Sequence, residues 1–178
     1  AWADYCDEMI DNGMGGTEPR CQVDAVVDDG AKAWDHALRI ARAGNAVLYP
    51  AGNLIGVRWM DPDRSLAQVF NSGAMSNLQI SWLDQRLRPN IIDVQILNEN
   101  EDWEQDMVSV EDADATGVFE PWTLGAEPLR RQVVKAWGVT RPSQALRMGN
   151  LLHAINTYQT MVAEFDCQID ALAAEVGD

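Results

Sequence analysis

The sequence predicts an α+β fold, in which a small α-β-α-β-β unit precedes a mostly antiparallel β domain with one packed helix. Helical spacing of apolar residues marks residues 2–10, 33–41 and 145–156. Strict alternation of apolar and polar residues marks residues 21–27, 78–82, 92–96 and 160–172. With 178 residues, of which 47% are hydrophobic, the chain can bury a core as one ordinary domain or two small ones.

Residues 1–63 are predicted to form the small α/β subdomain. Its first helix ends at Asn12-Gly13, because glycine readily adopts the conformation that ends a helix, and a half-buried strand follows over 21–27. Asp28 or Asp29 can cap the next helix, which ends at Gly44. Residues 47–60, with a turn at 51–53, predict a β-hairpin.

Residues 64–76 are predicted to be a connection, and residues 77–178 to be the larger β domain, truncated at its C-terminus. Thr140 is the expected N-cap of its helix, with Pro142 in the first turn. The chain begins without methionine and stops just after a strand, so we expect a fragment of a longer protein. The strands expected in this part span residues 78–82, 92–96, 106–111, 130–137 and 160–172.

The charge balance excludes some classes of partner. The chain has 28 acidic and 13 basic residues and a net charge of −15. Such a chain repels phosphate backbones and anionic lipid surfaces, so we expect neither nucleic-acid binding nor membrane docking. The sequence shows no signal peptide and no run of 18 apolar residues, so no membrane span is expected in this segment.

The three cysteines, Cys6, Cys21 and Cys167, form neither a disulfide framework nor a metal-ligand pattern, because their number is odd and their spacing wide. Cys21 and Cys167 fall on the apolar side of predicted strands, so we expect both to be small buried hydrophobic residues. Free thiols fit synthesis in a reducing cytoplasm.

No pattern in the sequence predicts catalysis, a cofactor or a metal. Asp35 and His36 are neighbours on a helix and therefore point apart. Carboxylate pairs, as in a glycosidase or cell-wall hydrolase, arise by chance in so acidic a chain. The segments 61–63 and 112–114 lack the remaining ligand positions of a calcium loop. The sequence therefore favours a protein that is not an enzyme.

Seven tryptophans are a high number for this length, and several fall near turns. Phe119, Trp122 and Trp103 are the candidates for contact with a partner protein, because exposed aromatic residues are enriched at interfaces. The same residues would also suit stacking on a sugar ring, so a carbohydrate-binding module of a host-recognition protein is the alternative.

The last predicted strand has one acidic side. Ala163 and Phe165 alternate with acidic residues, and Glu164, Asp166 and Asp170 are therefore expected to lie on a solvated face.

Six segments, taken in order, resemble the bacteriophage tip attachment protein J family, the central hub of the tail. They are a helix with a glycine turn, the start of the next helix, a hairpin strand, an Asn/Asp-rich loop before an aromatic residue, a strand end, and the approach to the last helix. Arg141-Pro142 stands where the family has a second basic residue, and Arg147 is what is left of a more basic helix. The segments are Ala1 to Arg20, Ala33-Trp34, Val47 to Tyr49, Asn98 to Trp103, Val108 to Asp112 and Gly138 to Ala145.

The resemblance implies a structural protein of the virion, made in the host cytoplasm and placed at the tail tip. Such a hub is a homotrimer that closes the distal tail tube, contacts other tail proteins and supports host attachment. A host receptor would be contacted only through other domains, and DNA would pass without specific binding. Residues 77–178 would be the barrel-like hub domain. The acidic side of the last strand, with Glu164, Asp166 and Asp170, would face the lumen or solvent and repel phosphates over roughly 8–10 Å.

Overall fold

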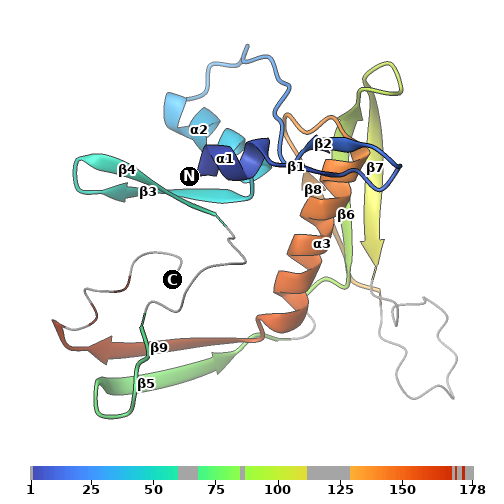
Figure 1. Ribbon diagram of the computed structural model, residues 1–178. Helices are drawn as coiled ribbons and strands as arrows, with labels where there is room; N and C mark the ends of the chain where they lie inside the picture. Colours follow the sequence, from blue (N-terminus) through green and yellow to red (C-terminus); the bar gives the residue numbers. More distant parts are fainter. Residues whose placement is uncertain are drawn as a thin grey trace, which may run out of the picture.

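The computed structural model describes residues 2–59, 68–84, 87–111, 129–169, 171 and 174. It shows a mixed α+β protein with more strands than helices (Figure 1). The helices are α1 (Trp2–Asp7), α2 (Ala33–Ala43) and α3 (Pro142–Tyr158). The strands are β1 (Met9–Asp11), β2 (Thr17–Pro19), β3 (Ala46–Ala51), β4 (Leu54–Trp59), β5 (Met75–Trp82), β6 (Ile91–Asn98), β7 (Glu104–Glu111), β8 (Arg131–Lys135) and β9 (Met161–Cys167).

The strands form four small sheets. Three are antiparallel pairs, β1-β2, β3-β4 and β5-β9, and the fourth has the order β7-β6-β8. In that sheet β6 is antiparallel to β7 and parallel to β8. Within the described residues the sheets stay open and do not close into a barrel, so the α+β class is confirmed, whereas the predicted barrel is not observed.

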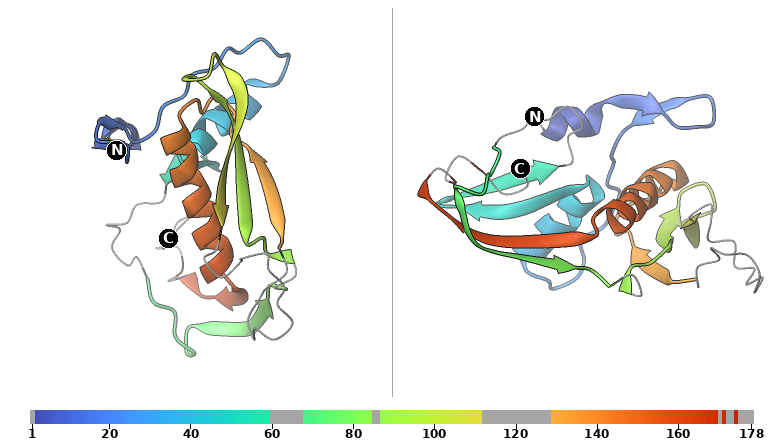
Figure 2. Two further views of the ribbon diagram at one scale, coloured as in Figure 1. Left: turned by 90° about the vertical axis from the view of Figure 1, so that its right-hand side faces the viewer. Right: turned by 90° about the horizontal axis from the view of Figure 1, so that it is seen from below.

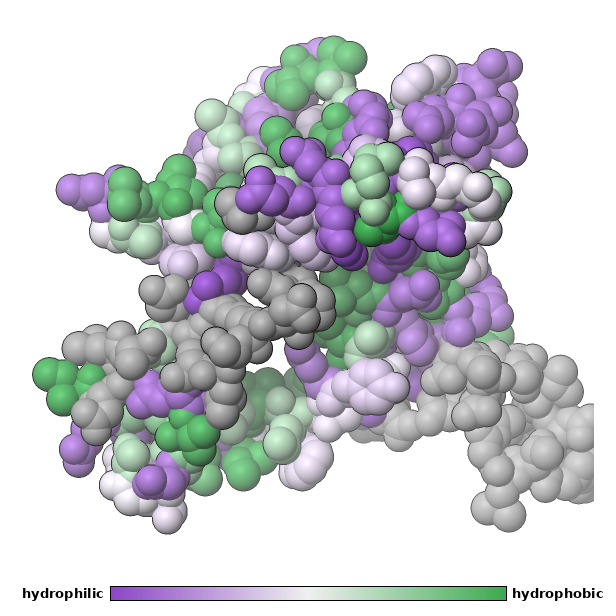
Figure 3. Space-filling model, viewed as in Figure 1, coloured by the Kyte–Doolittle hydropathy of each residue, from purple (hydrophilic) through white to green (hydrophobic). Residues whose placement is uncertain are grey.

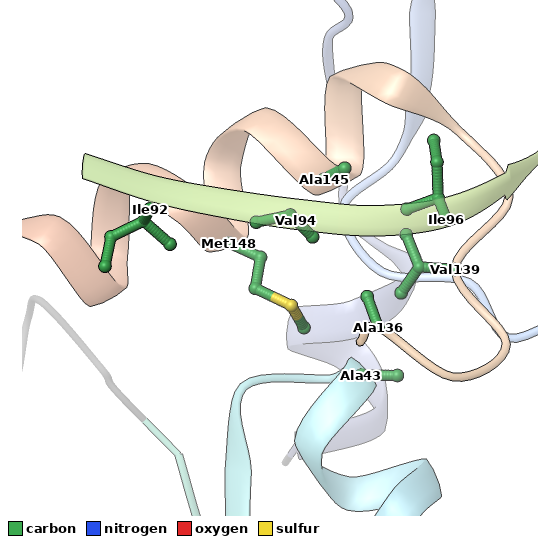
Figure 4. Close-up of a cluster of buried hydrophobic side chains, with 8 residues drawn as sticks. All are labelled: Ala43, Ile92, Val94, Ile96, Ala136, Val139, Ala145 and Met148. Atoms are coloured by element: carbon green, nitrogen blue, oxygen red, sulfur yellow. The ribbon is translucent and has the colours of Figure 1, made fainter. Parts of the chain in front are cut away.

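The hydrophobic core lies between β6 and α3 (Figure 4). Alternate residues of β6 point to this side, and Ile92 and Val94 are fully buried there. Ala145 and Met148 of α3 pack against them, and Ala43 from the end of α2 joins the same cluster. The core thus includes residues from both predicted subdomains, and the division at residues 63 and 77 stays a prediction.

α3 lies very close to the sheet because Gly149 faces it. A Cβ atom at this glycine would lie 2.7 Å from Cγ2 of Val110 and 3.3 Å from Cγ2 of Val94. Gln144 and Met148 of α3 are also buried, whereas Leu146 is 45% exposed.

Two predicted helix caps are wrong. The N-cap of α3 is Arg141 rather than Thr140, whose hydroxyl is 3.1 Å from Oδ2 of Asp24. The N-cap of α2 is Lys32, and neither cap residue makes a side-chain capping bond. Asp29 instead accepts a hydrogen bond from Arg39 at 2.7 Å, so its carboxylate binds the exposed side of the helix. Pro142 in the first turn of α3 and Gly44 at the end of α2 are confirmed.

The predicted strand over residues 21–27 is also wrong, because this segment has no strand partner. Its backbone is held by other groups: the Asp24 N–H donates to the Gly138 carbonyl at 2.8 Å, and Gln22 binds the side chain of Gln144. A short hairpin of β1 and β2 precedes it. Cys21 is consequently only half-buried, and Cys167 at the end of β9 is exposed.

The first predicted helix is too long: α1 ends at Asp7, and residues 9–11 form β1, so two short strands stand where the predicted order α-β-α-β-β has one. The remaining predicted elements are found, with changed ends. The β3-β4 hairpin, the β6-β7 hairpin and β8 lie where periodicity places them. β5 starts at Met75, inside the predicted connection, and β9 ends at Cys167, before the predicted end at 172. Within the described residues, no helix is long and apolar enough to span a membrane.

Candidate functional site

β5 and β9 form a two-stranded ribbon that projects from the foot of α3, away from the three-stranded sheet (Figures 1 and 2). Its base is fixed by two interactions. The Leu83 N–H donates to the Thr160 carbonyl at 2.9 Å. The Arg88 guanidinium donates to the Asn156 carbonyl at 2.9 Å, in the last turn of α3. These contacts attach the ribbon to the end of α3.

One face of the ribbon is apolar. Ile80 pairs with Ala163 and Trp82 with Met161, so these side chains share a face, and Phe165 and Cys167 continue it along β9. Ile80 is 53% exposed and Trp82 is 72% exposed. Figure 3 shows hydrophobic surface over this part of the molecule. Phe165 is covered in part by Phe70, with the ring centroids 5.1 Å apart.

The opposite face is polar. Gln79 pairs with Glu164, and Ser76 pairs with Asp166, so both carboxylates of β9 lie on this side. Both are exposed, as predicted for Glu164 and Asp166, whereas Asp170 lies outside the described residues. The ribbon therefore has an apolar surface on one face and an acidic surface on the other.

A β-bulge in β5 keeps the apolar side chains of this strand on one face of the ribbon. Between Ser76 and Gln79 the register shifts, so two residues of β5 lie opposite Phe165. Asn77 takes the left-handed conformation, with φ of 53°, and its amide donates to Oδ2 of Asp166 at 2.6 Å. Met75 and Ile80 are five residues apart and would point to opposite faces of a regular strand, and the extra residue of the bulge brings both to the apolar face.

We expect Asn77→Val to destabilise the protein by about 1–2 kcal/mol, because a β-branched residue is strained in the left-handed conformation. Asn77→Gly, which keeps that conformation and loses only the exposed hydrogen bond to Asp166, should cost less than about 1 kcal/mol. Urea unfolding of the two variants measures the difference. Equal losses would show that the hydrogen bond, not the backbone conformation, maintains the bulge.

A second surface feature is a groove of about 760 Å³ at the three-stranded sheet. Its lining includes Gln95 of β6, Lys135 of β8 and the coil at Asp24 to Val26. Trp103 lines the groove and is 56% exposed, and its contact with a partner stays a prediction. Phe119 and Trp122, the other predicted contacts, lie outside the described residues.

Sequence reasoning missed a polar cluster that joins the β1-β2 hairpin to α3. Glu18 lies 2.8 Å from Nη1 of Arg147 and 3.4 Å from Nη1 of Arg141, and Ser143 donates to it at 2.6 Å. Burial alone would raise the pKa of Glu18, but these hydrogen bonds and the two arginines outweigh burial and lower that pKa. The sequence signal for this cluster was weak: two arginines, Arg141 and Arg147, lie close together in an otherwise acidic chain.

His36 does not pair with Asp35, its neighbour on the helix. His36 Nε2 lies 3.0 Å from Oδ1 of Asp29 rather than near Asp35, and its ring lies beside that of Trp137. Within the described ranges no three His, Cys, Asp or Glu side chains are grouped so as to hold a metal ion.

Comparison with known proteins agrees with the resemblance drawn from the sequence segments. Residues 38–178 match the model of the family described as "Putative phage tail protein". The chain is also similar to the protein named "Tip attachment protein J" of Escherichia phage SECphi27, with 26% identity over 176 residues. The match covers 98% of this chain and 14% of that protein, so the chain spans about one seventh of its relative's length. The chain belongs to this family of phage tail proteins.

Proposed function

We propose that the protein is a structural, non-enzymatic subunit of the tail tip, a homotrimeric hub that closes the distal tail tube, supports host attachment and lets DNA pass. The observation that carries this proposal is the β5-β9 ribbon, with an apolar face and an acidic face back to back. The similarity to a tip attachment protein supports the place of action. In this proposal residues 77–178 are the barrel-like hub domain and residues 1–63 a smaller subdomain, joined by 64–76.

The apolar face needs a cover. A two-stranded ribbon alone is marginally stable in water, and contiguous exposed apolar side chains mark protein interfaces. Ile80, Trp82 and Met161 are each more than half exposed on this face. Permanent subunit interfaces resemble a domain core cut in half, which is the composition of this face. We assign it to contact with the neighbouring subunit of the trimer.

The acidic face then points toward the lumen. Glu164 and Asp166 lie on it, and Asp170 is proposed to continue the row. A carboxylate surface repels phosphates over roughly 8–10 Å at physiological salt, so DNA slides past without binding. Trp103, Phe119 and Trp122 are proposed to contact other tail proteins, with the host receptor bound through other domains. The protein would be made in the host cytoplasm and act in the virion.

The test is the solution mass of the gene product, measured by sedimentation with and without a neighbouring tail protein. We expect a trimer, and we expect the double variant I80S/W82S to be monomeric with unchanged circular dichroism. The matched control Q79S/S81A changes the same strand on its polar face and should stay trimeric. A monomeric parent under both conditions would refute the hub, and a trimeric I80S/W82S would refute the assigned face.

The groove at Trp103 favours a second function, carbohydrate binding. It combines an exposed indole with the side chains of Gln95, Gln105 and Lys135, a set that can stack on a sugar ring and bind its hydroxyls. If this function is correct, host-surface glycan should bind in titration calorimetry, and Trp103→Ala should weaken binding at least about tenfold, a loss of about 1.4 kcal/mol. Trp82→Ala, which removes an exposed indole elsewhere, should leave binding unchanged.

A further inference from the structure

We propose that Cys6 and Cys21 are a latent disulfide pair, reduced in the cell and joined by an oxidised thiol buffer such as glutathione disulfide. Their backbones are already in contact, because the Cys21 N–H donates to the Cys6 carbonyl at 3.1 Å. The bond lengths of a peptide then limit the distance between the two Cα atoms to at most about 7 Å. Disulfides span Cα distances of about 4.4–6.8 Å, so little backbone movement is needed.

The side chains also meet. Each thiol lies close enough to the other to change its pKa, and both side chains are half-buried. Tyr5 and Arg20, the residues immediately before the two cysteines, stack on each other with the guanidinium carbon 4.7 Å from the ring centroid. This second contact holds α1 and the segment after β2 side by side, so the thiols stay near each other.

The protein environment keeps the pair reduced during synthesis. Burial, together with the neighbouring Cys21, raises the pKa of Cys6 to about 12, and burial also raises the pKa of Cys21. Because the thiolate is the reactive form, both react slowly at neutral pH. Burial still raises the pKa of Cys21 overall, but the nearby Arg147 acts against burial there, so we take Cys21 as the thiol that reacts first.

The reaction is a double thiol–disulfide exchange. The Cys21 thiolate, having lost its proton to solvent, attacks glutathione disulfide and releases one glutathione thiolate. Cys6 then loses its proton, attacks the sulfur of Cys21 and releases the second glutathione. Two protein thiols and one glutathione disulfide become one protein disulfide and two glutathione thiols, so electrons and protons balance.

The bond would fasten the N-terminal helix to a segment that α3 already holds. Arg147 donates to the Arg20 carbonyl at 3.0 Å, and Gln144 binds Gln22 on the other side of Cys21. Only the timing of the reaction rests on the proposed function, because a virion released by lysis leaves the reducing cytoplasm. The geometry of the pair does not depend on that role.

The test is oxidation of the purified protein in a glutathione buffer, followed by alkylation with N-ethylmaleimide and mass spectrometry. We expect Cys6 and Cys21 to become unreactive together, with a mass decrease of two hydrogens and no glutathione attached to either. Trypsin cuts after Arg20 and Lys32, so a disulfide-linked pair of peptides, ending at these residues, identifies the bond. The rate should rise about tenfold per pH unit between pH 7 and 8, because the thiolate fraction does.

Three variants make the test decisive. Exposed Cys167 is the internal control, and Cys167→Ser should leave the Cys6–Cys21 bond unchanged. Cys6→Ser should leave Cys21 carrying glutathione, because no second thiol displaces it. A parent protein that keeps glutathione on Cys21, or that pairs either cysteine with Cys167, would overturn the proposal. None of these outcomes depends on whether the protein is a trimer.

Discussion

Replacing Gly149 by leucine is expected to destabilise the protein by at least about 3 kcal/mol, because the added side chain would prevent α3 from packing so close to the sheet. The Cβ alone would lie 2.7 Å from Cγ2 of Val110 and 3.3 Å from Cγ2 of Val94. Both neighbours are β-branched and have few alternative rotamers, so neither can move aside cheaply. Urea unfolding followed by tryptophan fluorescence measures the loss.

Asn150→Leu is the matched control, since it adds the same side chain one position along the helix, at an exposed site. It should change stability by less than about 0.5 kcal/mol. Gly149→Ala separates two effects, because alanine favours a helix by about 1 kcal/mol over glycine while its methyl group meets the sheet. A net gain in stability for Gly149→Ala would show that α3 can move outward and that the close approach is not required.

Gln144→Ala is expected to cost about 3 kcal/mol, because this one buried amide satisfies three backbone groups at about 1 kcal/mol each. Its Oε1 accepts from the Gln22 N–H at 3.0 Å, and its Nε2 donates to the carbonyls of Gln22 at 3.1 Å and Ala43 at 3.2 Å. Residues 21–27 lie in no sheet. The Gln144 amide therefore makes hydrogen bonds to this segment that a neighbouring strand would otherwise make.

Gln132→Ala, at an exposed position of β8, is the control and should be nearly neutral. Hydrogen exchange gives a local measurement for the same variant. The amide of Gln22 should exchange faster in Gln144→Ala, while amides of β6 should change only as much as global stability does. Unchanged protection at Gln22 would mean that another group holds this segment.

Local patterns predict a large part of this fold. α2, α3 and the two hairpins β3-β4 and β6-β7 follow from helical spacing, alternation and turn residues, all of which act over a few neighbours. The prediction fails where a distant group decides. Residues 21–27 alternate like a strand, yet the side chain of Gln144, more than a hundred residues away, takes the place of a ladder.

Local patterns likewise predict some features of the candidate site and miss others. The alternation in β9 places Glu164 and Asp166 on one exposed face, and the solvent exposure of Trp103 follows from its loop. Nothing local reveals the bulge at Asn77, the pairing of β5 with β9 or the contact between Cys6 and Cys21. Each of these depends on which segments meet, and sequence separation hides that information.

The pairing of β5 with β9 sets the order in which the chain can fold. Met75 pairs with Cys167, so the ribbon encloses the hairpin β6-β7, strand β8 and helix α3 in one long loop. During synthesis β5 leaves the ribosome long before β9 exists, and its apolar side chains stay without a strand partner meanwhile. Contacts of such high sequence separation form late and slow folding. A ribosome that pauses inside α3 would therefore hold an unpaired, aggregation-prone strand, and a chaperone that binds short apolar segments would find β5 as its first target.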